Sequence, residues 1–141
     1  MTTPLLCLLF FAGWTLLIVV GGVVSKRVWL VLTRKAAANS FASGQPHGTE
    51  LYQRFMRAHA NAVENLPVFA SVVVVCHLAG VQDPTVDKLA VACVVARVCQ
   101  SCVHIASNRN IAVQIRFTFY MAQVVCVLWM AGRSLVVTGY L

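Results

Sequence analysis

The sequence predicts an all-α integral membrane protein, folded as an up-and-down bundle of four transmembrane helices in a single domain. The chain has 141 residues, of which 60% are hydrophobic and only 11% are charged. Soluble domains are nearer one half apolar and about a quarter charged. The apolar residues fall into four long segments, and the last two connections between them are short. Short connections make neighbouring helices antiparallel, which predicts the bundle topology.

The first segment, Leu5 to Val24, is an uncharged run of 20 residues. At about 1.5 Å per residue it covers the roughly 30 Å of a bilayer core. A secretory signal peptide is the alternative interpretation. However, Met1 to Pro4 carries no basic residue, and Lys26 and Arg27 follow the apolar run instead of preceding it. We therefore expect a retained membrane helix over residues 5–29.

Three further spans complete the predicted bundle, over residues 51–81, 86–107 and 111–138. The long connection over residues 34–50 is rich in Ala, Asn, Ser and Gly, which predicts a loop. Pro67 lies inside the second span. Because proline has no backbone N–H, we expect a kink or a locally opened turn there.

The basic residues are sorted by connection, which predicts the orientation in the membrane. Eight of them lie before or at the start of the second span, or around the connection between the third and fourth: Lys26, Arg27, Arg34, Lys35, Arg54, Arg57, Arg109 and Arg116. The connection between the second and third spans holds Asp83, Asp87 and Lys88. The positive-inside rule therefore places the first and third connections in the cytoplasm and both termini on the other side. This sorting accounts for the net charge of +7 without a nucleic-acid partner.

The six cysteines lie in or beside apolar segments, where a cysteine is most simply a small packing residue. Cys99 and Cys102 form a C-x-x-C pair. A membrane helix lacks the strand–helix context of a redox motif, and zinc would need a second pair. His59, His77 and His104 lie on different spans and at different depths. We therefore expect no metal site.

Arg97 lies near the middle of the third predicted span. An arginine at that depth costs roughly 2.5–3.5 kcal/mol unless it faces a partner or a wet cavity. The chain has four acidic residues, of which Asp83 and Asp87 belong to the opposite connection and Glu50 to the loop. We therefore predict an Arg97–Glu64 pair inside the bundle. Whether such a pair only holds helices together stays open at this point.

Helical spacing gives three spans a polar stripe near their cytoplasmic ends. His59 points away from the stripe of the second span. The stripes consist of Arg57, Asn61 and Glu64, with Arg54 and Asn65 at the edges; of Arg97, Gln100, Ser101, His104 and Asn108; and of Arg116, Tyr120 and Gln123. One stripe could be arginine snorkelling to the interface. Three stripes at similar depth favour a polar pocket with excess positive charge, which fits an anion or zwitterion that carries carboxylates.

The segment RAHANAVEN, from Arg57 to Asn65, resembles the R-x-H-x-N-x-x-E-N signature of the MAPEG family, the membrane-associated proteins in eicosanoid and glutathione metabolism. The resemblance continues through ARV at 96–98 and through Arg116 with Tyr120 one turn later. It covers most of the chain. It implies a four-helix subunit in a homotrimer, with glutathione bound near the cytoplasmic side between adjacent subunits.

The resemblance also implies roles for individual residues. The glutathione site or its immediate support would contain Arg57, Asn61, Glu64, His104 and Tyr120. Arg116 would lie near the sulfur as the catalytic residue. Structural support would come from Arg97, Asn65 and Gln100. His104 stands where several members have a tyrosine, and it could donate to the peptide, act as a base or form hydrogen bonds only within the bundle.

The chemistry of glutathione agrees with these roles. It carries two carboxylates and one ammonium group, so arginines can bind its acids and Glu64 can bind its amine. A thiol with a pKa near 8.5 is only a few per cent thiolate at neutral pH. Lowering that pKa by two units takes about 2.7 kcal/mol, which one arginine in a partly dehydrated pocket could supply.

The leading hypothesis is a membrane glutathione transferase or peroxidase that presents the thiolate to a lipophilic electrophile or a lipid hydroperoxide from the bilayer. Phe117, Phe119 and Trp129 could shape the pocket for that substrate. Two alternatives stay open: a non-catalytic membrane adaptor that binds glutathione or lipid, and a small transporter.

Overall fold

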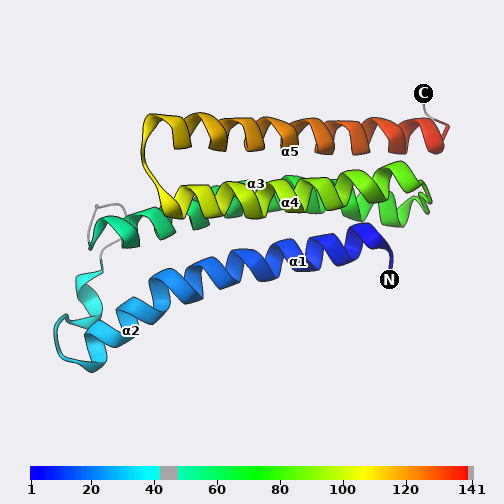
Figure 1. Ribbon diagram of the computed structural model, residues 1–141. Coiled ribbons are helices and arrows are strands. Elements are labelled where there is room, and N and C mark those ends of the chain that lie inside the picture. The colour runs from blue at the N-terminus through cyan, green and yellow to red at the C-terminus, as the bar shows by residue number, and fades with distance from the viewer. Residues whose placement is uncertain (42–47, 140–141) are drawn as a thin grey trace.

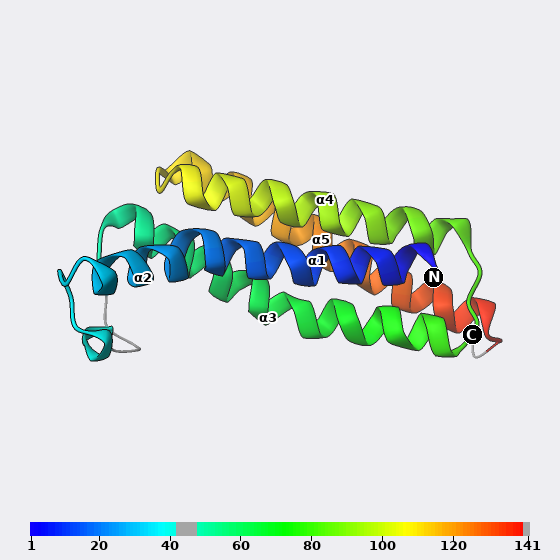
Figure 2. The ribbon, with the colours of Figure 1, turned by 90° about the horizontal axis from the view of Figure 1, so that it is seen from below.

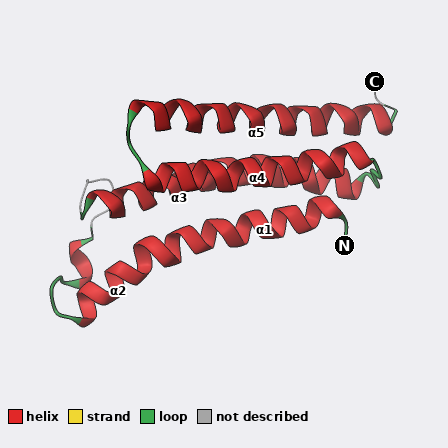
Figure 3. Cartoon of the chain, viewed as in Figure 1, coloured by secondary structure: helices red, strands yellow, loops and turns green. Residues whose placement is uncertain are grey.

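The computed structural model describes residues 1–41 and 48–139, and within these ranges the chain is helical without strands (Figure 3). The predicted loop over 34–50 therefore lies partly outside the described residues. The elements in chain order are α1 (Thr3–Ile18), the π-helix η1 (Val19–Val24), α2 (Ser25–Leu32), the short 3-10 helix η2 (Ala38–Ser40), α3 (Glu50–Leu78), α4 (Pro84–Ala106) and α5 (Asn110–Val137).

Four helices are long and apolar enough to cross a membrane: Thr3–Leu32, Glu50–Leu78, Pro84–Ala106 and Asn110–Val137. They correspond to the four predicted spans. The first continues past residue 29 to Leu32, because Lys26 and Arg27 end the apolar run without ending the helical hydrogen bonding.

The pair α3–α4 forms the middle of the bundle, with α1 on one side and α5 on the other (Figures 1 and 2). Helix α1 packs on both α3 and α4, whereas α5 packs mainly on α4. The chain runs up and down, so both termini lie at the same end as the α3–α4 connection (Figure 1). We call this the termini end and the opposite one the loop end. The cytoplasmic orientation of the loop end stays a prediction.

The core lies where side chains of the four long helices meet. Phe11 of α1 and Phe69 of α3 stack with ring centroids 5.6 Å apart, and Cys93 of α4 and Met130 of α5 are buried with them. Many other large apolar side chains are exposed. In a bilayer these are the side chains that face lipid or other protein, so this distribution fits a membrane bundle.

Local sequence signals set the starts of two helices. Helix α3 begins after Thr49, whose hydroxyl oxygen accepts a hydrogen bond from the Tyr52 backbone N–H. Helix α4 begins with Pro84 after Asp83, whose carboxylate accepts from the Thr85 N–H at 2.8 Å. Each cap satisfies a backbone donor that the first turn of a helix leaves free. Helix α3 continues through Pro67 without a break, and the kink or locally opened turn expected there stays a prediction.

The π-helix η1 was not predicted from the sequence. It contains the pair Gly21–Gly22, and Gly22 lies against Phe55 of α3. A Cβ added at Gly22 would lie 2.0 Å from Phe55 Cδ1 and 2.7 Å from its Cβ. The missing side chain therefore lets η1 approach α3 closely. A single π-helical turn inside a long helix is a rare local feature, and it occurs here at the point of closest approach.

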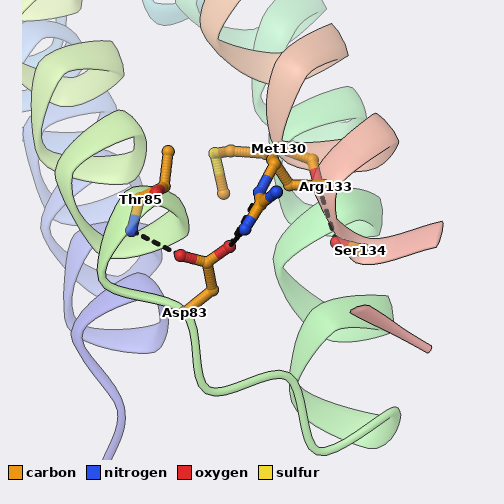
Figure 4. Close-up of polar contacts among 5 residues, drawn as sticks. All are labelled: Asp83, Thr85, Met130, Arg133 and Ser134. Atoms are coloured by element: carbon orange, nitrogen blue, oxygen red, sulfur yellow. Dashed lines mark hydrogen bonds and ion pairs between the residues drawn. The ribbon is translucent and has the colours of Figure 1, made fainter. Parts of the chain in front are cut away.

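At the termini end, Arg133 of α5 binds Asp83 in the α3–α4 connection (Figure 4). The guanidinium donates through Nη2 at 2.6 Å and through Nε at 2.8 Å to Asp83 Oδ2. It is the single ion pair within residues 1–41 and 48–139. The Thr85 backbone N–H, and then the Arg133 guanidinium, hold the pKa of Asp83 below its usual value. No partner for Arg133 was predicted from the sequence.

We expect Asp83→Asn to lower the melting temperature at neutral pH. The pKa of Asp83 is lower in the folded protein than the value of about 3.9 in the unfolded chain. Its contribution is therefore present above that value and is lost as the pH falls through the folded-state pKa. Thermal unfolding of detergent-purified protein at a series of pH values measures this. The difference in melting temperature between Asp83→Asn and wild type should become smaller in acid. A difference in melting temperature that is the same in acid as at neutral pH contradicts the ion pair. Asp87→Asn, which removes a charge from the same turn, is the control.

We expect Gly22→Ala to destabilise the fold by about 1–3 kcal/mol, because the added methyl overlaps the base of the Phe55 side chain. Gly13→Ala is the matched control, since nothing lies within 4 Å of a Cβ added there. That change should be neutral or stabilising, as alanine is the better helix former. Chemical unfolding gives the free energy of unfolding of both variants. Equal stability of the two would mean that η1 and α3 are not in close contact.

Candidate functional site

Arg97 lies in the middle of the bundle with only 1% of its surface exposed. Its Nη1 donates to Asn61 Oδ1 of α3 at 2.6 Å. Its guanidinium carbon lies 5.2 Å from the centroid of the Phe11 ring of α1, a distance at which a cation is attracted by an aromatic face. Arg97 Nε and Nη2 have no hydrogen-bond partner among the described residues. One guanidinium thus joins α4 to α3 and α1.

The predicted Arg97–Glu64 pair is wrong. Arg97 binds the amide of Asn61, and Glu64 is exposed. The amide oxygen accepts the hydrogen bond without a second charge being taken out of water, whereas a buried carboxylate would add its own desolvation cost. Glu64 makes no ion pair within the described ranges.

The prediction that Arg57, Asn61 and Glu64 face inward together is also wrong. Arg57 and Glu64 are exposed, while Asn61 is half-buried. The face of α3 that is buried carries mainly small and aromatic residues: Tyr52, Ala58, Ala62, Phe69, Val73 and Cys76. Small residues let helices pack closely, so they take the interior, and the charged residues of the signature lie on the outer side of the subunit.

His59, the histidine of the signature, points toward α1. Its Nδ1 lies 3.2 Å from the backbone oxygen of Thr15, at hydrogen-bond distance. The Thr15 hydroxyl donates to the Phe11 carbonyl at 2.9 Å. This agrees with the prediction that His59 lies off the polar stripe, and the structure adds what it contacts. The histidine joins α3 to α1 one turn before η1.

Two buried glutamines connect α4 to α5. Gln100 and Gln123 are 4% and 3% exposed. Gln123 Nε2 donates to Gln100 Oε1 at 3.0 Å and to the Phe119 carbonyl at 2.9 Å. Gln100 Nε2 donates to the backbone carbonyl of Arg116 at 3.1 Å. Beside them, Ser101 is also buried and donates to the Arg97 carbonyl. The buried face predicted for α4 is confirmed at these positions.

A cationic cluster lies closer to the loop end. It consists of the guanidinium groups of Arg57 (α3) and Arg116 (α5), which are electrostatically coupled, and of the His104 imidazole (α4), which both arginines affect. Arg57 is exposed, and the other two are half-buried. No acidic side chain is bonded to any of the three within the described residues. We call these three residues the cationic cluster.

A cavity of about 150 Å³ lies between the four long helices, on the α3–α5 side. Its wall is mostly apolar, and three polar residues contribute to it: Asn65, Tyr120 and Gln123. Asn65 Nδ2 donates to the Asn61 carbonyl at 2.8 Å, and Tyr120 interacts electrostatically with Arg97. Gln123 Oε1 has no hydrogen-bond partner in the described part of the chain. Tyr120 therefore borders the cavity and is also electrostatically coupled to Arg97 of α4.

A comparison with known families now adds to this geometry. Residues 2–136 match the MAPEG family. The chain belongs to the MAPEG family. Searches among curated proteins and among solved structures returned no match. The MAPEG match covers nearly the whole chain and confirms the resemblance found in the sequence. With four helices able to span a membrane, this MAPEG protein is a multi-pass membrane protein of glutathione-related or eicosanoid metabolism.

The MAPEG chain shows no cluster of three or more His, Cys, Asp and Glu side chains that could hold a metal ion, among the residues that the structure describes. The cysteines of the C-x-x-C pair are free: Cys99 is half-buried and Cys102 is exposed. Neither bears on the candidate site.

Sequence reasoning missed several contacts at the loop end of this MAPEG subunit. Arg54 Nη1 donates to the Ala106 carbonyl at 2.7 Å, and Asn108 Nδ2 donates to Glu50 Oε1 at 3.2 Å. Both contacts join the start of α3 to the end of α4. Asn108, which was expected in the α4 stripe, is exposed. The polar composition of these helix ends was visible in the sequence, but the pairing was not.

We expect Asn61→Ala to destabilise the protein by about 1–3 kcal/mol, because it leaves a buried guanidinium without its side-chain acceptor. In an Arg97→Met background the same change should cost much less. A double-mutant cycle on thermal stability measures this coupling. The matched cycle between Glu64→Gln and Arg97→Met should show coupling below about 0.5 kcal/mol. Strong coupling between Glu64 and Arg97 together with weak coupling between Asn61 and Arg97 would instead support the Arg97–Glu64 ion pair.

Proposed function

We propose that this MAPEG protein binds glutathione, stabilises its thiolate and conjugates it to lipophilic electrophiles, or uses it to reduce lipid hydroperoxides. The observation that carries the proposal is the cationic cluster, in which α3, α4 and α5 each contribute one group. Membership of a family of glutathione-related and eicosanoid metabolism supports the choice of ligand. A cluster without a bonded acid suits a ligand with two carboxylates and a thiolate.

The exposed side of α3 supports the same ligand. Arg57 and Glu64 are seven positions apart on one helix, and both are exposed. Arg57 can bind a carboxylate of glutathione, and Glu64 can bind its ammonium group. Because Arg97 is held by Asn61, the Glu64 carboxylate is not committed to it. We further propose that a homotrimer forms and that this outer face borders the adjacent subunit, with glutathione between them.

Arg116 is the residue that we propose to stabilise the thiolate. It is half-buried, so its charge is screened less than that of an exposed side chain. A shift of two units in the thiol pKa corresponds to about 2.7 kcal/mol. One guanidinium at hydrogen-bond distance from the sulfur can contribute on that scale. Tyr120, one turn along α5, would border the peptide on the cavity side.

The chemistry then follows from the thiolate. In conjugation, the thiol proton passes to solvent, sulfur forms a bond to the electrophilic carbon, and the leaving group departs with the bonding electrons. In peroxide reduction, sulfur attacks the terminal oxygen and the O–O bond breaks, giving the sulfenic acid and an alkoxide that takes a proton from solvent to become the alcohol. A second glutathione then condenses with the sulfenic acid to give the disulfide and water. The exposed side chains of Phe117 and Trp129 on α5 lie where a lipophilic substrate would arrive from the bilayer.

We expect Arg116→Ala to raise the pKa of bound glutathione by about two units and to remove most conjugation of a chromogenic electrophile at neutral pH. Titration of thiolate absorbance in the ultraviolet gives the pKa. Arg116→Lys should keep part of the effect, since it retains the charge but not the fork of donors. Arg109→Ala, an exposed arginine at the start of α5, is the control. A thiol pKa that is the same in wild type and Arg116→Ala would exclude this role.

The same preparations separate the other functions. Glutathione binding without turnover in conjugation and hydroperoxide assays would favour a membrane adaptor. Glutathione-independent flux in proteoliposomes would favour a transporter. Neither alternative requires the thiol pKa to depend on Arg116.

A further inference from the structure

The two buried glutamines form a chain of hydrogen bonds that begins and ends on α5. Gln123 donates to the Phe119 carbonyl and to Gln100 Oε1, and Gln100 donates to the Arg116 carbonyl. We call this the amide chain. Both of its terminal acceptors lie on the turn of α5 that carries the Arg116 side chain. Gln100 lies on α4, so its hydrogen bond to the Arg116 carbonyl attaches this turn of α5 to the neighbouring helix.

The orientation of both amides follows from their acceptors. The carbonyls of Arg116 and Phe119 can only accept, so each must face an NH₂ group. If Gln100 directs its NH₂ to Arg116, its oxygen must face Gln123, and Gln123 must then present its own NH₂. Rotating either amide by half a turn would place oxygen against oxygen or nitrogen against nitrogen. The chain therefore has one arrangement in which all three hydrogen bonds form, with Gln123 Oε1 left without a partner among the described residues.

The amide chain lies in the interior of the bundle, between α4 and α5. Both glutamines are almost completely buried, so removing one amide leaves its partner groups shielded from bulk water. Helix α5 has few other polar ties at this level, and it packs mainly on α4. Sideways movement or rotation of this turn of α5 would break the bond between Gln100 and the Arg116 carbonyl. It would also carry the Arg116 guanidinium away from Arg57 and His104.

We propose that Gln100 and Gln123 are positioning residues that hold Arg116 at the distance from the sulfur at which it stabilises the thiolate. The inference rests on the proposed function and extends it to Gln123, which does not belong to the cationic cluster. Displacing a catalytic group by about 1 Å can cost on the order of 100-fold in rate. The amide chain resists that displacement, although neither glutamine touches the substrate.

The first test does not require glutathione. Phenylglyoxal modifies arginine side chains, and mass spectrometry gives the rate at each position of the detergent-purified protein. Gln100→Met and Gln123→Met remove the amides while keeping side chains of similar length. We expect modification of Arg116 to become several-fold faster in both variants. The exposed Arg109, which lies outside the cationic cluster, serves as the internal reference, and Gln114→Met, which changes an exposed glutamine of α5, as the matched control. Arg116 rates that equal wild type in both variants overturn the proposal.

The second test uses glutathione. We expect Gln100→Met and Gln123→Met to raise the pKa of the bound thiol and to lower kcat about tenfold, with the KM for glutathione changing less than threefold. The double variant should be no worse than Gln100→Met alone, because the two amides act as one unit. In an Arg116→Ala background, Gln100→Met should leave the thiol pKa where it is. Two results would assign the glutamines to packing only and overturn the proposal. One is a further shift of the thiol pKa when Gln100→Met is added to Arg116→Ala. The other is a loss of kcat that accompanies a loss of thermal stability while the thiol pKa is unchanged.

The two tests separate failure of the inference from failure of the proposed function. If wild type shows no bound thiolate but Arg116 reacts faster in both glutamine variants, the glutathione function is wrong and the positioning of Arg116 stands. If wild type forms the thiolate and the glutamine variants keep its pKa, the function stands and the positioning is wrong. Should Gln100→Met fail to assemble in detergent, Gln123→Met tests the same chain, since it removes the donor to Gln100 and leaves Gln100 in place.

Discussion

The structure depends on how a guanidinium is kept in the middle of an apolar bundle without a carboxylate. Arg97 is held by one amide oxygen, that of Asn61, and by the face of the Phe11 ring. These partners come from α3 and α1, so the solvation of one side chain of α4 requires three helices to be in register. Burial of an unpaired charge is costly. The cost is reduced here by neutral groups, which leaves the positive charge itself uncompensated within the subunit.

This arrangement divides the signature on α3 into two sets of residues. Asn61 and His59 are used inside the subunit, on Arg97 and on the Thr15 carbonyl. Arg57 and Glu64 stay on the outer side, where neither makes an ion pair among the described residues. From the sequence, Glu64 was expected to pair with Arg97 and to bind the glutathione amine. The structure removes the first of these roles. The side chains bonded inside the subunit and the exposed charges are thus separated on one helix by a rotation of less than one turn.

Much of the fold was predictable because membrane helices follow directly from composition. The four spans, their alternation and the buried face of α4 at Arg97, Gln100 and Ser101 depend on length and on a 3.6-residue period. The Arg97–Glu64 pair failed because a helical projection shows which residues lie close together, but not whether an amide or a carboxylate is the acceptor. The π-helix, the Asp83–Arg133 pair and the Gln100–Gln123 contact arise from tertiary packing. No local pattern in the sequence marks them.

The ion pair at the termini end also bears on how the bundle can move. Arg133 binds Asp83, and nearby the Cys76 thiol and the Ser134 hydroxyl are 2.9 Å apart, so α5 is fastened to the α3 side at that end. Toward the loop end, the described polar contacts of α5 run to α4 through Gln100. Among the described residues, the polar contacts that tie α5 to α3 and to the α3–α4 connection therefore lie at the termini end. Any widening of the space between α3 and α5 toward the loop end would change the spacing between Arg57 and Arg116 more than any spacing near Asp83.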